Sequence, residues 1–88
     1  MTSWRLAFKR EAEKDLEDID TSMKNRIVEK LDWFASNFDH VKHLELRQGL
    51  AGYFKLRIGD WRAIYKFNEA HHLITVFAIR HRSRVYDT

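Results

Sequence analysis

The chain has 88 residues, a formal net charge of +3 and no cysteine, which excludes disulfide bonds and thiolate metal sites. A chain of this length forms one domain with a modest core, and we predict a single domain over residues 1–88. No apolar run reaches the ~20 residues that cross a bilayer, and MTSWRLAFKR lacks the apolar core of a signal peptide, so we expect a cytoplasmic protein.

The charge is unevenly distributed along the chain. Residues 1–40 carry seven Lys/Arg and nine Asp/Glu, a balance of −2, whereas residues 41–88 carry nine and four, a balance of +5. A localised basic surface usually faces a polyanion. We therefore expect a binding site in the second half of the chain.

The first half of the chain predicts a strand followed by two helices. Trp4, Leu6 and Phe8 alternate with other residues, which is a strand pattern. Asp20-Thr21-Ser22 then provides a stop and N-cap signal between two amphipathic segments. Their apolar stripes have helical spacing and consist of Ala12, Leu16 and Ile19 in the first segment and Met23, Ile27, Leu31 and Phe34 in the second.

The stretch YFKLRIGDWRAIYKF, residues 53–67, predicts a β-hairpin. Gly59-Asp60 suits a two-residue type II′ turn, and folding there places Phe54, Leu56, Ile58, Trp61, Ala63 and Tyr65 on one apolar face. The other face carries Lys55, Arg57, Arg62 and Lys66, with Tyr53 and Ile64 between them. In this register Arg57 faces Arg62, and facing like charges destabilise an antiparallel pair. The cations therefore indicate a function rather than a role in folding.

The last strong strand signal is LITVFAIR, residues 73–80. It is apolar at nearly every position, which is typical of a central strand covered in part on both sides. With a loop at about residues 69–71, alternation places Arg80 with the cations and places Leu73, Thr75, Phe77 and Ile79 on the core face.

These elements predict an α+β fold. A short N-terminal strand and an antiparallel hairpin of two helices precede a mainly antiparallel sheet of three or more strands, with the helices packed on one sheet face. A weak extended segment, residues 43–52, leads into the hairpin. The cations occupy the opposite face, and the tail RHRSRVYDT extends from the last strand towards it.

With this order of motifs the sequence resembles the RelE/ParE toxins of type II toxin–antitoxin systems. The resemblance covers most of the chain and rests on KDLEDID, IVEKL, GYFKLRIGDWRAIYKF and the terminal HRSRVY. It implies the RelE-like microbial RNase fold and a cognate antitoxin as partner. For the RelE-like branch it also implies a toxin that inhibits translation as an endoribonuclease, cleaving mRNA in the ribosomal A site without a metal.

The resemblance implies site residues wherever the motif matches. Lys55 and Arg62 take basic positions that the RelE-like branch uses for phosphate binding and transition-state charge, and Tyr86 takes the place of its C-terminal tyrosine. Depending on a short gap, Arg80 and Arg82 each fit the arginine after the last strand, and many relatives carry a glycine where this chain has Arg80. The predicted catalytic set is Arg62, Arg82, Tyr86, Arg80 and His81, and the predicted RNA-binding set is Lys55, Arg57, Lys66 and Arg84.

The residue types suit metal-free RNA cleavage without reference to the family. The 2′-hydroxyl must lose its proton, the phosphorane charge must be stabilised, and the leaving oxygen must be protonated. A guanidinium binds phosphate oxygens and stays charged. Tyr86 could serve as a base only if surrounding cations favoured its phenolate, and the alternative is that its ring stacks on the scissile nucleotide. His81 could also carry a proton near neutrality. No cofactor or metal is expected, because His71-His72 has no further ligand at metal-site spacing.

Two other functions stay open at this point. One is ParE-like inhibition of DNA gyrase on the same fold, by binding rather than by RNA chemistry. The other is a non-catalytic module that binds only its antitoxin or nucleic acid. The ribonuclease hypothesis is favoured because Lys55, Arg62, Arg82 and Tyr86 are all present, whereas the gyrase-binding members generally lack this full set.

Overall fold

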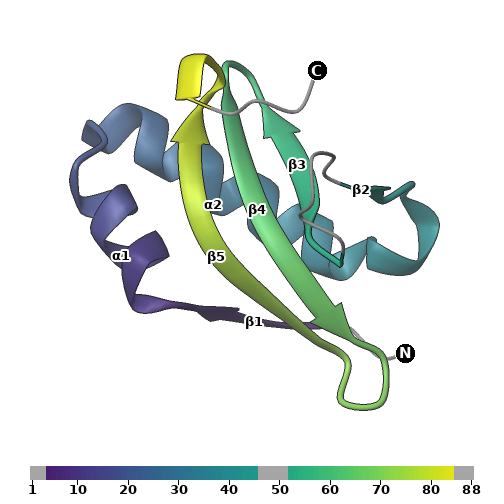
Figure 1. The fold of residues 1–88 in the computed structure, drawn as a ribbon. Helices are drawn as coiled ribbons and strands as arrows, with labels where there is room; N and C mark the ends of the chain where they lie inside the picture. Colours follow the sequence, from purple (N-terminus) through teal and green to yellow (C-terminus); the bar gives the residue numbers. More distant parts are fainter. Residues whose placement is uncertain (1–3, 46–51, 85–88) are drawn as a thin grey trace.

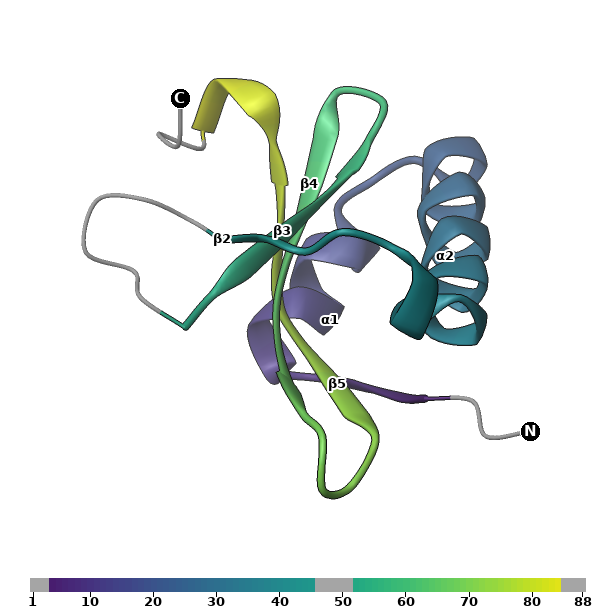
Figure 2. The same cartoon turned by 90° about the vertical axis from the view of Figure 1, so that its right-hand side faces the viewer.

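The protein is built around one five-stranded sheet with the strand order β1-β5-β4-β3-β2. The computed structural model describes residues 4–45 and 52–84. Helix α2 packs across one face of the sheet, and α1 lies beside β5 (Figure 1, Figure 2). The elements are β1 (Arg5–Phe8), α1 (Arg10–Glu17), α2 (Thr21–Ser36), η1 (Phe38–His40), β2 (Leu44–Glu45), β3 (Phe54–Ile58), β4 (Trp61–Asn68), β5 (Leu73–His81) and η2 (Arg82–Arg84). The predicted α+β fold is confirmed.

The N-terminal strand and both helices form where the sequence pattern places them. β1 pairs in parallel with the first part of β5, from Arg5 opposite Leu73 to Phe8 opposite Val76. Asp20 has the extended backbone of an N-cap before α2, although its side chain makes no capping hydrogen bond. Ile19 lies just beyond α1 and is still buried in the core.

The β3–β4 hairpin has the predicted register. Gly59 has a φ of 61°, a left-handed conformation that glycine adopts at little cost. The turn sets Ile58 opposite Trp61 and Arg57 opposite Arg62. Because side chains alternate along a strand, this register directs the apolar set to α2 and the cations to the other face.

The predicted side-chain alternation of β5 is wrong over its first half. The loop before it spans residues 69–72, one residue longer than expected, and Asn68 pairs with Leu73. The side chains that reach the core are therefore those of Ile74 and Val76, both 0% exposed, whereas Leu73, Thr75 and Phe77 belong to the opposite face.

A β-bulge then restores the predicted alternation in the second half of β5. Tyr65 pairs with Val76 but Ile64 pairs with Ala78, so Phe77 is the extra residue. Beyond it, Ile79 is buried and Arg80 lies opposite Arg62, as the sequence predicted.

The core has two parts, one of which contains a polar pair. An aliphatic cluster joins α1 and α2 to the strands, and an aromatic cluster gathers around Phe34, Phe38 and Tyr65. His43 lies against the second cluster, with Nδ1 2.7 Å from the Tyr65 hydroxyl and Nε2 3.1 Å from the Phe38 carbonyl. Since a carbonyl can only accept, Nε2 donates and Nδ1 accepts the Tyr65 proton. Burial raises the pKa of Tyr65, which keeps this hydroxyl protonated.

Within the described residues, no helix is both long and apolar enough to cross a membrane.

Candidate nucleic-acid interface

Three arginines lie side by side across the sheet on the face opposite α2, which we call the open face. Arg57 on β3 faces Arg62 on β4, and Arg62 in turn faces Arg80 on β5. We call this set the arginine row. Like charges in facing positions of a sheet destabilise it, so the row needs either compensating anions or a ligand.

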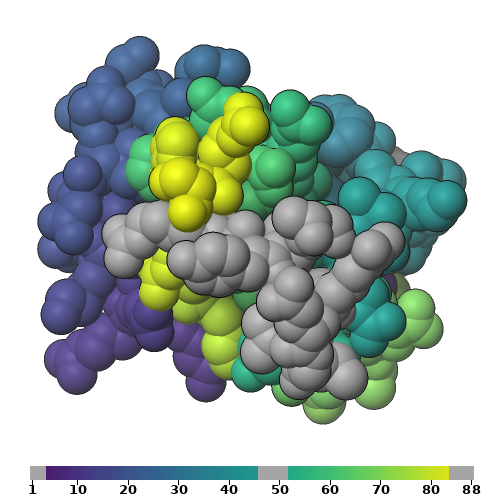
Figure 3. Space-filling view, turned by 45° about the horizontal axis from the view of Figure 1, so that its top comes forward, coloured from purple at the N-terminus to yellow at the C-terminus, as the bar shows by residue number. Residues whose placement is uncertain are grey.

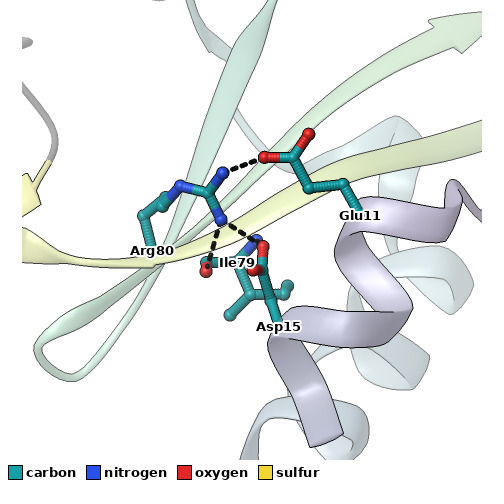
Figure 4. A network of polar contacts seen from close by, with 4 residues as sticks. All are labelled: Glu11, Asp15, Ile79 and Arg80. Carbon is teal, nitrogen blue, oxygen red and sulfur yellow. Dashed lines mark hydrogen bonds and ion pairs between the residues drawn. The ribbon is translucent and has the colours of Figure 1, made fainter. Parts of the chain in front are cut away.

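Arg80 has its compensating anions within the fold. Its guanidinium donates to the carboxylates of Glu11 and Asp15, both from α1 (Figure 4). The same Asp15 oxygen accepts the backbone N–H of Ile79 at 2.9 Å. The Asp15 side chain is 20% exposed and that of Arg80 23% exposed, so this contact is partly screened from water. Arg80 thereby ties α1 to the part of β5 that lies beyond β1.

Arg62, in the middle of the row, lacks such compensation. Its guanidinium makes a long hydrogen bond, 3.4 Å, to the carbonyl of Trp61. Within residues 4–45 and 52–84 no carboxylate forms an ion pair with it. Arg57 is exposed, and its Nε donates to the carbonyl of Gly59 at 3.3 Å. The positive charge of the row is therefore concentrated at Arg62 and Arg57.

Arg82 lies on η2, just beyond β5 and beside the turn between β3 and β4. Its backbone N–H donates to the carbonyl of Asp60 at 2.7 Å, which fastens η2 to the turn between β3 and β4. Figure 3 shows η2 lying against this turn, and in Figure 2 η2 bends to the side opposite α2. The Arg82 guanidinium lies 3.7 Å from the Asp60 carboxylate, with both side chains more than half exposed. Such an exposed pair is worth little, so Arg82 can exchange it for a ligand phosphate.

His81 is separated from the arginine row, although it is adjacent in sequence. It pairs with Trp61, and the two rings meet edge to face at 5.3 Å. Its Nδ1 accepts the N–H of Ser83 at 3.3 Å. Because alternate side chains of a strand point to opposite faces, His81 lies on the other side of β5 from Arg80.

The remaining predicted residues lie on the open face, in η2 or outside the residues that the structure describes. Lys55 and Lys66 share the face of Arg57 and Arg62 by alternation along β3 and β4. Arg84 is the last residue of η2. Tyr86 lies outside the described residues.

Three residues at this face, Tyr53, Phe77 and Lys9, were not among the predicted site residues. Tyr53 and Phe77 meet edge to face with ring centroids 5.2 Å apart. Lys66 lies over the ring of Tyr53 at 4.4 Å, and Lys9 over the ring of Phe77 at 5.5 Å. Tyr53 was recognisable in the sequence as a neighbour of the cations. Phe77 gave no sequence signal, because the loop length and the bulge place it on this face. Lys9 gave none either, because it meets Phe77 only in the folded chain.

The surrounding hollows are open and charged rather than deep. One, of about 420 Å³, lies between α2 and the end of β3 and is lined by Arg26, Glu29, Lys30, Arg57, Ile58 and Gly59. Among the residues that the structure describes, no cluster of three or more histidine or acidic side chains could hold a metal ion. The open face is thus equipped for binding an anion directly through side chains.

Comparison with known proteins agrees with this fold. The family model of the ParE toxin of type II toxin–antitoxin systems, parDE, matches residues 6–86. The chain is similar to the RelBE2 toxin–antitoxin complex from Mycobacterium tuberculosis, at 25% identity and a TM-score of 0.82, covering 94% of this chain and 95% of that chain. No curated protein matches the chain by sequence.

Two further solved structures have the same fold at lower identity. The archaeal RelE–RelB complex from Pyrococcus horikoshii is 22% identical, with a TM-score of 0.73 over 96% of this chain and 100% of that chain. The chromosomal ParDE system from P. aeruginosa is 15% identical, with a TM-score of 0.71 over 90% and 96%. The fold is therefore shared by proteins named RelE and proteins named ParE, so the choice between their activities depends on the side chains of the open face.

Proposed function

The chain belongs to the RelE/ParE toxin family of type II toxin–antitoxin systems, and from this premise we propose that it acts as a metal-free endoribonuclease. The substrate is mRNA positioned in the ribosomal A site, and cleavage stops translation. The observation that supports this proposal is the arginine row together with Arg82 on the adjoining η2. A gyrase-binding protein has no chemical need for such a row, whereas phosphoryl chemistry does.

Arg62 is the residue that we assign to transition-state charge. It lies between two other arginines and has no carboxylate partner in the described part of the chain. A phosphorane placed over Arg62 would remove the repulsion in the row and gain charge-assisted, bidentate hydrogen bonds. The interaction is strongest where negative charge develops, which is what catalysis requires.

We assign the second catalytic arginine to Arg82 rather than to Arg80. Moving Arg80 onto a phosphate would leave Asp15 and Glu11 without their counter-charge in a partly buried position. Moving Arg82 costs only an exposed contact with Asp60. Arg80 is then a positioning residue, which fixes the end of β5 and hence the start of η2.

The other predicted residues take supporting roles in this proposal. Lys55, Arg57, Lys66 and Arg84 bind the RNA backbone. Tyr86 is assigned to the cleavage step, as a proton acceptor or as a ring that stacks on the scissile nucleotide. His81 is not assigned to proton transfer, because its ring faces Trp61 and its Nδ1 accepts the N–H of Ser83. No cofactor is required by this scheme.

A cognate antitoxin is the proposed protein partner. The similar structures from Mycobacterium tuberculosis and Pyrococcus horikoshii are toxin–antitoxin complexes. An acidic segment placed on Arg57 and Arg62 would occupy the phosphate position and block the RNA. The partner is expected to neutralise the toxin in this way.

Inhibition of DNA gyrase is the second candidate, because the matching family model is that of ParE. The two activities separate in one pair of assays on purified protein. Primer extension on ribosome-bound mRNA detects cleavage, and inhibition of the supercoiling of relaxed plasmid by gyrase detects the alternative.

The expected result is A-site cleavage that Arg62→Ala slows about 10²–10³-fold and Lys24→Ala leaves intact. Lys24 is a suitable control because it is a basic residue of α2, which covers the other face of the sheet. Loss of gyrase activity without any RNA cleavage would contradict the proposal and favour the ParE-like function.

A further inference from the structure

The open face contains a second feature at a distance from the arginine row. Tyr53 and Phe77 pack edge to face, and a lysine lies over each ring, Lys66 over Tyr53 and Lys9 over Phe77. We call the two rings the aromatic platform. It lies next to a hollow of about 320 Å³ whose lining includes Lys9, Lys66, Asn68, Leu73, Thr75 and Phe77.

A backbone irregularity places Phe77 on this surface. Phe77 is the extra residue of the β-bulge between β4 and β5. A bulge disrupts the ladder locally, and bulges often re-aim a side chain next to a functional site. Without the bulge, the alternation that buries Val76 could not also bury Ile79. The bulge therefore lets both Val76 and Ile79 be buried in the core and places Phe77 in the platform.

The core does not account for these side chains. Tyr53 and Phe77 are half-buried and contact each other and the ammonium groups of Lys66 and Lys9, whereas the two lysines are exposed. Lysine has a long flexible stem, so each ammonium can leave its ring for a phosphate while the ring accepts another planar group. A pair of rings flanked by mobile cations matches the two chemical parts of a nucleotide.

The platform also lies in line with the arginine row. Lys66 and Arg62 are on the same strand and the same face, four residues apart. At about 3.3 Å per residue this separation is ~13 Å. A single strand of nucleic acid follows such a basic track while its bases stack on aromatic side chains.

We propose that the aromatic platform binds a base of the RNA strand that flanks the cleaved bond, with Lys9 and Lys66 on the adjacent phosphates. This inference rests on the proposed ribonuclease function and adds the site that holds the substrate outside the reacting nucleotides. The favoured occupant is RNA rather than an acidic peptide, because a peptide carboxylate would use the lysines but not the rings.

Direct binding tests the platform independently of catalysis. The probe is a fluorescent single-stranded RNA, titrated by anisotropy with the purified chain and its variants. Phe77→Leu keeps an apolar side chain but removes the ring, and it should weaken binding about 5- to 150-fold, the worth of one stacked base. Phe77→Tyr keeps the ring and should bind as wild type.

The lysines are tested by the salt dependence of the same titration. Lys66→Gln and Lys9→Gln should each lower the slope of log affinity against log salt by about 0.7, the value for one phosphate contact on a single strand. Lys24→Gln is the matched control, since Lys24 is a lysine of α2, which covers the other face of the sheet. It should leave the slope unchanged.

The possible results of these experiments separate the role of the platform from the proposed ribonuclease function. Wild-type RNA affinity of Phe77→Leu overturns the inference, and so does a loss confined to binding of the antitoxin. Platform-dependent RNA binding without any A-site cleavage would refute the proposed function and leave the platform standing. Thermal unfolding of each variant checks that the fold is retained. If Phe77→Leu does not fold, Tyr53→Leu, which removes the other ring of the platform, replaces it in the test. Wild type and Phe77→Tyr, which both keep the two rings, are then the reference proteins.

Discussion

On the sheet face beneath α2, Ala63, Ile74 and Val76 have no exposed surface, whereas the open face presents Arg57, Arg62 and Arg80 in facing positions. The two faces alternate along the same strands. We call the face beneath α2 the covered face. Its side chains pack in the core, whereas the open face brings like charges together, which does not contribute to packing. This difference indicates that substitutions on the covered face should change stability, and that substitutions on the open face should change function.

The largest expected effect is a cavity on the covered side. Ile27 of α2 is 0% exposed, and Ile27→Ala should lower the free energy of unfolding by about 2–5 kcal/mol. The matched variant is Ile64→Ala on the open face, where the side chain is half-buried and the loss should be about 1 kcal/mol. Chemical denaturation measures both. Equal losses would show that the two faces do not differ in packing.

The next effect concerns the anions that compensate Arg80. Asp15→Ala leaves the Ile79 N–H and the Arg80 guanidinium without an acceptor, and should cost about 1–3 kcal/mol. Glu11 bonds the same arginine, but its side chain is 63% exposed, so Glu11→Ala should cost less than about 1 kcal/mol. Denaturant titration of the two variants gives the comparison. An equal cost for both would mean that the partial burial of Asp15 is unimportant.

A smaller effect is expected from the polar pair in the aromatic core. Tyr65→Phe removes the hydroxyl that donates to His43, and should cost about 1 kcal/mol near neutral pH. The pKa of Tyr65 is raised by burial above the ordinary value of ~10. Wild-type stability should therefore be unaffected by this group below that pH and should fall as pH rises above it, because the unfolded state loses the proton first.

The alkaline part of this prediction has its own test. In Tyr65→Phe the fall in stability above the ordinary pKa of tyrosine should become shallower than in wild type. Thermal unfolding across the alkaline range gives the slopes. Identical slopes in wild type and Tyr65→Phe would contradict the assignment of a buried, protonated hydroxyl.

The smallest effect on stability is expected in the arginine row. Arg57→Ala removes one member of a facing like-charge pair, so stability should stay the same or rise by a few tenths of a kcal/mol. The rise should shrink in high salt, since the charges are near solvent. A loss of more than 1 kcal/mol would place Arg57 among the residues that hold the fold together.

The sequence was sufficient to predict the hairpin but not the final strand. In the hairpin, a two-residue turn at Gly59 and the period of two fix every pair, including Arg57 with Arg62. In β5, one more loop residue and a bulge at Phe77 each shift the alternation by one. An apolar run gives no indication of its register, because both of its faces look alike, so Leu73, Thr75 and Phe77 were assigned to the wrong face.

The sequence predicted which arginines gather near the open face, but not which of them forms ion pairs within the fold. The motif indicates Arg62, Arg80 and Arg82, but their difference comes from α1, which brings Glu11 and Asp15 to Arg80 alone of the three. No local pattern connects residues so distant in the chain. The same holds for His81, whose separation from Arg80 follows from the direction of adjacent side chains on β5.

Arg62→Ala tests most directly the claim that the open face serves RNA rather than folding. The measurement combines the free energy of unfolding with the single-turnover rate of A-site mRNA cleavage on the same preparation. We predict stability equal to wild type or a few tenths of a kcal/mol higher, together with a rate about 10²–10³-fold lower. A destabilised Arg62→Ala protein that still cleaves at the wild-type rate would contradict the account.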